Sequence, residues 1–132
     1  MDIAPMEDEF AGAFWQGARE HRLLIDRCGD CGWWIHHPRP MCPHCLTRNV
    51  TPQEVSGRGR VVSTAVTHRP PVPTDPDELP VLHVLVELDE QPGLRLASTV
   101  VGDERPSIGD RVEVVFDDRP GGFTLPRFRL VA

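Results

Sequence analysis

Hydrophobic and polar residues alternate with a period of two along most of the second half of the chain. This pattern predicts five short strands, at residues 60–67, 81–88, 94–101, 111–116 and 123–131. Clusters of glycine, proline, aspartate and serine separate these segments and predict turns. Because little helical pattern lies between the strands, we expect a small barrel: an OB-fold first, with a five-stranded SH3-like barrel as the alternative.

A helical pattern lies near the start of the chain. Apolar residues recur at helical spacing at Phe10, Phe14, Trp15 and Ala18, after an acidic stretch. A strand-like run follows at residues 23–25. We therefore expect a short amphipathic helix whose aromatic pair packs on the next segment, with docking to a partner protein as the alternative role.

All four cysteines of the chain lie in two C-x-x-C pairs. This spacing lets both sulfurs of one turn reach the same ion, and two such turns complete a tetrahedral coordination sphere without an open position. The pattern predicts a structural zinc site with four ligands: Cys28, Cys31, Cys42 and Cys45. Four thiolates also bind iron, and two disulfides are a further alternative, but zinc is the expected ion of a structural ribbon.

The sequence thus predicts a mainly β protein of three segments. Residues 1–27 form the N-terminal helical segment, residues 28–53 the zinc ribbon and residues 54–132 the barrel. Residues 68–80 join the first two barrel strands and carry five of the 14 prolines, which excludes the interior of a helix or strand. We expect a stiff, extended excursion, which is either a functional loop or a rigid connector.

The charge and composition of the chain exclude several function classes. The net charge is −6, whereas general binding to nucleic acid needs a basic face. All 14 basic residues are arginine, and the absence of lysine and tyrosine excludes a lysine Schiff base and a tyrosine general acid. An acidic N-terminus, the lack of a long apolar run and the zinc-type cysteines predict a cytoplasmic protein.

Histidines supply the acid–base candidates. His36, His37 and His44 lie in the ribbon, where four cysteines already satisfy the metal, so we expect them at the surface or in packing. His68 ends the first barrel strand and His83 lies within an apolar strand. No spacing joins either to a nucleophile and a carboxylate, so a free-standing thioester hydrolase is the least favoured function.

Several motifs in order resemble the DUF35 family. They are the Phe14-Trp15 pair, the two C-x-x-C pairs, and residues 38–40, 56–61, 68–71 and 124–128. The resemblance covers about residues 10–130 and implies a rubredoxin-like zinc ribbon joined to an OB-fold. It also implies an accessory role beside thiolases, hydroxymethylglutaryl-CoA synthases or lipid-transfer-protein-type thiolase homologues, which include retro-aldolases of steroid side chains held on CoA.

In such assemblies the partner carries the catalytic residues and the small subunit completes the acyl-CoA site. Residues expected to face acyl-CoA or the partner are His68, Arg69, Arg58, Arg60, Arg127 and Arg129. Arginine forks suit the phosphates of CoA, although solvated arginines that offset 20 carboxylates are the alternative. Residues expected to dock the partner are Phe14, Trp15, Trp33 and Trp34. The alternative function is a single-stranded nucleic-acid-binding module, in which Trp33 and Trp34 stack on bases.

Overall fold

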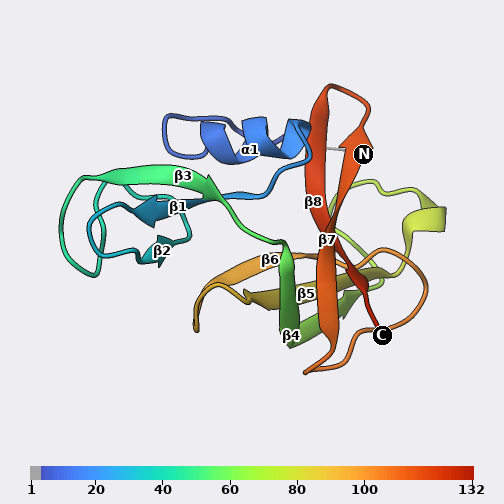
Figure 1. The fold of residues 1–132 in the computed structure, drawn as a ribbon. Coiled ribbons are helices and arrows are strands. Elements are labelled where there is room, and N and C mark those ends of the chain that lie inside the picture. The colour runs from blue at the N-terminus through green and yellow to red at the C-terminus, as the bar shows by residue number, and fades with distance from the viewer. Residues whose placement is uncertain (1–3) are drawn as a thin grey trace.

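The computed structural model describes residues 4–132 and arranges them in two lobes (Figure 1). A helix and a three-stranded sheet form the N-terminal lobe, and a five-stranded barrel forms the other. The elements are α1 (Gly12–Arg19), β1 (Leu24–Cys28), β2 (Trp34–Ile35), β3 (Val50–Glu54), β4 (Arg58–Thr67), the 3-10 turn η1 (Pro76–Glu78), β5 (Val81–Leu88), β6 (Arg95–Thr99), β7 (Arg111–Arg119) and β8 (Phe123–Leu130). The predicted mainly β architecture with one short N-terminal helix is confirmed.

The predicted helix is α1, which lies beside the upper half of β8 in Figure 1. The Asp8 carboxylate accepts hydrogen bonds from the backbone N–H groups of Phe10 and Ala11, at 2.9 and 2.7 Å, and so orders the turn before the helix. A Cβ on Gly17 would lie 2.6 Å from Leu24 Cγ, so glycine is required for the close approach of α1 to β1.

The ribbon sheet has the order β2-β1-β3, with antiparallel pairs. Its pairing runs from Leu24 opposite Glu54 to Cys28 opposite Val50, so the sheet begins before the first cysteine. Pro52 lies on β3 at the edge of the sheet, where its missing N–H costs no ladder hydrogen bond. The predicted segment boundary between residues 53 and 54 falls within β3, and the division into three segments stays a prediction.

The barrel sheet has the order β6-β5-β4-β7-β8. Its two outer strands approach each other where the chain leaves β6: Val100 bridges to Phe128, and the Ser98 hydroxyl donates to the carbonyl oxygen of Pro126 at 2.6 Å. Strict alternation along β5 places its even-numbered residues in the core, as the period of two predicted. β7 runs three residues beyond its predicted end at residue 116, because a tight hairpin with two positive-φ glycines, Gly121 and Gly122, continues its pairing with β8.

One hydrophobic core joins the two lobes. Leu23, Ile25 and Trp34 from the ribbon lobe belong to the same buried cluster as Val86 and Phe128 of the barrel. The ribbon is therefore packed on the barrel by apolar burial, and not merely tethered to it. Within residues 4–132, no helix is long and apolar enough to cross a membrane.

Candidate functional site

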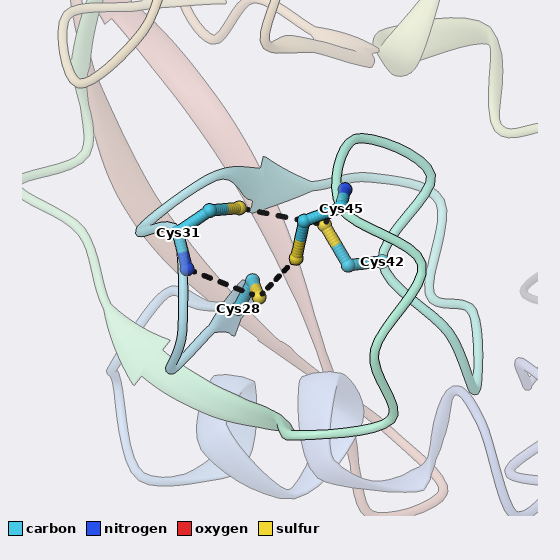
Figure 2. A group of neighbouring side chains, drawn as sticks. All are labelled: Cys28, Cys31, Cys42 and Cys45. Atoms are coloured by element: carbon cyan, nitrogen blue, oxygen red, sulfur yellow. Dashed lines mark hydrogen bonds between the residues drawn. The ribbon is translucent and has the colours of Figure 1, made fainter.

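The four predicted metal ligands converge at the far end of the ribbon lobe. Figure 2 shows Cys28 and Cys31 on one loop facing Cys42 and Cys45 on the other. All four sulfurs lie within 4.8 Å of one another, with 3.5 Å between the sulfurs of Cys28 and Cys45 and 3.7 Å between those of Cys31 and Cys42. Tetrahedral zinc with Zn–S bonds of about 2.3 Å separates its sulfurs by about 3.8 Å, so the cluster has the size of a zinc site.

Two similar turns hold the sulfurs. In the first, the backbone N–H of Cys31 donates to the Cys28 sulfur at 3.5 Å. In the second, the N–H groups of His44 and Cys45 donate to the Cys42 sulfur at 3.4 and 3.5 Å. N–H donors stabilise sulfur in its thiolate form, which is the form that binds metal. The two loops therefore present ligands and not disulfides, and all four cysteines are free.

The thiols also show why a cation is needed. The backbone N–H of Cys31 and the hydroxyl of Thr47 lower the pKa of Cys28 to about 6. At Cys31 the backbone N–H of Trp33 favours the thiolate, but desolvation and hydrogen bonds with the three other sulfurs outweigh it and raise the pKa to about 12. Four thiolates at this spacing repel one another unless a divalent cation neutralises them. The predicted structural zinc therefore fits Cys28, Cys31, Cys42 and Cys45, where it would cross-link the two loops.

The three histidines near the cysteines do not join this cluster of sulfurs. His44 stacks on Trp33, with ring centroids 4.6 Å apart. His36 packs beside Phe14, with ring centroids 5.9 Å apart, and beside His37. Their places agree with the expectation of surface and packing roles.

A second candidate site is an apolar groove between the lobes. It has a volume of about 390 Å³ and lies between α1, the segment after β2, and strands β6 and β8. Its walls include Phe14, Trp15, His36, Ala97, Leu125 and Arg127. Burial, with a smaller contribution from His37, lowers the pKa of His36 to about 4, so this imidazole is neutral at neutral pH. Sequence reasoning identified the aromatic pair but not the facing wall, which comes from strands far away in the chain.

A larger, polar cavity of about 610 Å³ lies beneath the proline-rich segment. It shares Thr99, Leu125 and Arg127 with the apolar groove, so the two hollows meet at these side chains. Arg119 donates to Glu78 at 3.0 Å and to Asp117 at 3.1 Å, which fastens η1 of the proline-rich segment to β7. The predicted excursion is therefore anchored over a cavity.

The predicted arginines do not form one cluster. Arg60 donates to Glu87 at 3.1 Å, and Arg129 donates to Glu113. Arg127 has different partners and donates to Thr99 at 2.8 Å and to Asp117 at 3.1 Å. Arg58 is exposed and lies opposite Glu113 in the barrel sheet, and Arg69 is exposed, as is its neighbour His68 beyond β4. Arg127 alone among the five lines the hollows described above.

The predicted docking aromatics lie in three different settings. Phe14 and Trp15 are half-buried in the wall of the groove and contact each other edge to face, with centroids 5.0 Å apart. Trp33 is 37% exposed on the ribbon. Trp34 is 8% exposed, belongs to the core, and lies beneath the guanidinium of Arg27 at 4.6 Å from the ring centroid. Trp34 therefore stabilises the fold and does not offer an exposed stacking face.

No catalytic triad is assembled among the described residues. The imidazole of His83 lies 3.0 Å from the Thr67 hydroxyl, but within residues 4–132 no carboxylate is hydrogen-bonded to that ring. His21 lies 3.0 Å from the carboxylate of Asp118, and the Thr124 hydroxyl donates to that same carboxylate. The threonine is therefore bonded to the acid and not to the histidine that would have to act as its base. The arrangement lacks the oriented base that activates a hydroxyl nucleophile.

Two family models match the chain. The rubredoxin-like zinc ribbon domain of ChsH2 matches residues 15–51, and the C-terminal OB-fold domain of ChsH2 matches residues 52–117. These matches confirm the predicted zinc ribbon and identify the barrel as the OB-fold and not the SH3-like alternative.

Curated relatives are of two kinds. A DUF35 domain-containing scaffold protein of Pyrococcus furiosus is 32% identical over 103 residues, which is 77% of this chain and 74% of that protein. A probable enoyl-CoA hydratase alpha subunit of Thermomonospora curvata is 40% identical over 120 residues. The 3-oxo-4,17-pregnadiene-20-carboxyl-CoA hydratase alpha subunit of Mycobacterium tuberculosis is 33% identical over 120 residues. Both matches span 89% of this chain but only 36% and 37%, respectively, of these two longer proteins.

Two solved structures are similar over most of the chain. A chain of the structure described as "Ltp2-ChsH2(DUF35) aldolase" is 34% identical with a TM-score of 0.87, and the match covers 98% of this chain and 100% of that one. A protein from Sulfolobus solfataricus, described as of unknown function and from the DUF35 family, is 17% identical with a TM-score of 0.63. The match covers 91% of this chain and 84% of that one, and it supports the fold alone.

Proposed function

Because this chain belongs to the DUF35 family, in which a rubredoxin-like zinc ribbon is joined to an OB-fold, we propose that it is an accessory subunit of an enzyme complex that acts on acyl-CoA. The observation that supports this proposal most directly is the similarity of the chain, over nearly its whole length, to a chain of the Ltp2-ChsH2(DUF35) aldolase structure. Two longer relatives are named as alpha subunits of CoA-thioester hydratases, which supports the same substrate class.

The proposed partner is a thiolase-fold enzyme, such as a thiolase, an acyl-CoA synthase or a steroid side-chain retro-aldolase. The name aldolase in the similar structure supports a carbon–carbon lyase within this group. The two proteins form a hetero-oligomer in the cytoplasm, where reducing conditions keep zinc-binding thiols reduced. The partner supplies the catalytic residues, and this chain helps to bind or shape the acyl-CoA site.

The residues of this chain support such a role by position and not by catalysis. Zinc held by the four cysteines fixes the ribbon, and the exposed Trp33 lies beside that site. The barrel contributes the loops that face the acyl-CoA, among them the proline-rich segment. The alternative of a nucleic-acid module is disfavoured, because carboxylates neutralise Arg60, Arg111 and Arg129 on the barrel.

The test of this function is the identity of the partner. The tagged, zinc-loaded chain is recovered from its native lysate, and the proteins retained in near-equal amount are identified by mass spectrometry. A thiolase-fold enzyme supports the proposal. RNA-handling proteins or nucleic acid in the eluate contradict it, and so does turnover of acyl-CoA by the isolated chain.

A matched pair of variants sharpens the test. Trp33→Ser removes an aromatic side chain that is 37% exposed on the ribbon, whereas Ile108→Ser removes an apolar side chain that is 73% exposed on the loop between β6 and β7. We expect Trp33→Ser to lose the partner enzyme while Ile108→Ser retains it. Equal recovery of the partner by both variants would contradict docking through the ribbon.

A further inference from the structure

The groove between the lobes has the features of a small-molecule pocket. Its volume of about 390 Å³ lies within the range of roughly 300–1,000 Å³ that is usual for ligand sites, and its walls are predominantly apolar. Two aromatic rings, Phe14 and Trp15, form the wall on α1, while Ala97 on β6 and Leu125 on β8 form the wall on the barrel. A flat protein contact would not need this concavity.

Polar side chains line the groove where it meets the polar cavity, and the imidazoles of His36 and His37 add polar groups on the side of the ribbon lobe. Arg127 lines the groove and the polar cavity beneath the proline-rich segment, and so does Thr99. The Arg127 guanidinium donates to Thr99 at 2.8 Å, to Asp117 at 3.1 Å and to the carbonyl oxygen of Val100 at 3.4 Å, which fixes its orientation. A guanidinium has five N–H donors and three are engaged in these bonds, so about two remain for a ligand at the point where the two hollows meet.

The charge around this junction selects among ligands. Four carboxylates line the polar cavity, namely Asp77, Glu78, Asp103 and Asp117. Three guanidinium groups oppose them, from Arg105, Arg119 and Arg127. The excess of carboxylates disfavours an anionic head group at the junction, whereas a neutral carbonyl oxygen can accept from Arg127 without that repulsion.

We propose that the groove binds the acyl chain of a thioester, with the apolar chain between α1 and the barrel and the uncharged thioester carbonyl beside Arg127. The choice of a thioester rests on the proposed function, which supplies this substrate class. The apolar chain of the ligand follows from the lining of the groove, and its uncharged polar group follows from the charges of the adjoining cavity. The site recognises the acyl part of the substrate and is separate from any contact with the CoA phosphates.

The probe is the octanoyl thioester of N-acetylcysteamine, which carries an apolar chain and a neutral thioester but no CoA. Binding to the full-length, zinc-loaded chain is measured by isothermal titration calorimetry, with octanoate and free CoA as comparison ligands. We expect saturable binding of the thioester, with octanoate at least about tenfold weaker, a difference of about 1.4 kcal/mol in binding free energy. Equal binding of octanoate, or no saturable binding of the thioester, overturns the proposal.

Two alanine variants locate the site. Ala97 and Ala65 are both exposed on the outside of the barrel sheet, but only Ala97 lines the groove. Ala97→Trp fills the groove without entering the core, and we expect it to weaken thioester binding at least about tenfold. Ala65→Trp on β4 serves as the control and should bind as the wild type does. Equal weakening in both variants, or none in Ala97→Trp, contradicts this placement.

The outcome is independent of whether a partner is found. If the isolated chain binds the thioester but recovers no partner enzyme, the accessory role fails and the groove proposal stands. If a thiolase-fold partner is recovered and the thioester does not bind to the chain alone or to the complex, the accessory role stands and the groove proposal fails.

Discussion

The side-chain amide of Gln91 pairs with both backbone groups of Trp34. The Trp34 N–H donates to Gln91 Oε1 at 2.9 Å, and Gln91 Nε2 donates to the Trp34 carbonyl oxygen at 3.0 Å. Trp34 lies on β2, an edge strand of the ribbon sheet, whereas Gln91 lies in the turn between β5 and β6 of the barrel. The amide thus takes the place of a neighbouring strand and joins the two lobes at a partly buried position.

Replacing Gln91 should weaken the junction between the lobes. Gln91→Ala leaves the buried N–H and C=O of Trp34 without these partners, so we expect the free energy of unfolding to fall by about 1–3 kcal/mol. Urea denaturation of the zinc-loaded protein, followed by tryptophan fluorescence, measures this change. Gln53→Ala, at an exposed position of β3, is the control and should stay within about 0.5 kcal/mol of wild type. A similar small effect at Gln91 would show that water replaces the amide.

Removing ligand sulfurs should abolish metal binding. We expect wild-type protein to carry about one zinc ion per chain, and the double variant Cys31→Ser, Cys42→Ser to carry none, because two thiolates alone do not complete the tetrahedral site. Native mass spectrometry and elemental analysis measure the metal content.

The control for the metal site is Thr47→Val. The Thr47 hydroxyl lies 3.6 Å from the Cys28 sulfur and 3.5 Å from the Cys45 sulfur but is not a thiolate ligand, so this variant should retain its zinc. Iron in place of zinc, or two disulfides in the native protein, would contradict the assignment.

A methyl group at Gly59 should destabilise the barrel. A Cβ there would collide with the carbonyl oxygen of Glu87 and lie 2.8 Å from Val86 Cγ1, and neither can move without shifting β5. We expect Gly59→Ala to lower the free energy of unfolding by about 1–3 kcal/mol, as overpacked cores do. Gly12→Ala at the start of α1, where no atom lies within 4 Å of the added Cβ, should be neutral or slightly stabilising by urea denaturation. Equal effects at the two positions would refute the steric account.

Stability should depend on pH through His36. Burial lowers its pKa from 6.5 to about 4, so between these values the unfolded chain binds more protons than the folded protein. The contribution of neutral His36 is complete above pH 6.5 and is lost as the pH falls towards 4, by at most about 3 kcal/mol.

The variant His36→Gln isolates this effect, because an amide does not titrate. The difference in unfolding free energy between wild type and His36→Gln should shift against the wild type as the pH falls from 7.5 to 4.5. His44→Gln, at an exposed position on the ribbon, is the control. A difference between wild type and His36→Gln that stays constant with pH would show that His36 is not protected from protonation in the folded state.

Much of the fold follows from local patterns in the sequence. A strand with one buried face must alternate apolar and polar residues, so the period of two located β4 to β8 to within a few residues. A C-x-x-C turn carries its own geometry, so the four metal ligands were identified without knowledge of the fold. The order of the motifs along the chain was sufficient to identify the family, because each motif is a short local segment that can be read without the fold.

The tertiary structure alone decided which side chains meet. Trp33 and Trp34 are neighbours in the chain, yet one is exposed and the other is buried beneath the barrel turn that carries Gln91. Arg127 and Arg129 share a strand and a face, but only Arg127 reaches the meeting point of the groove and the cavity. These outcomes depend on packing between segments that are distant in sequence, and local periodicity carries no information about the partner across the interface.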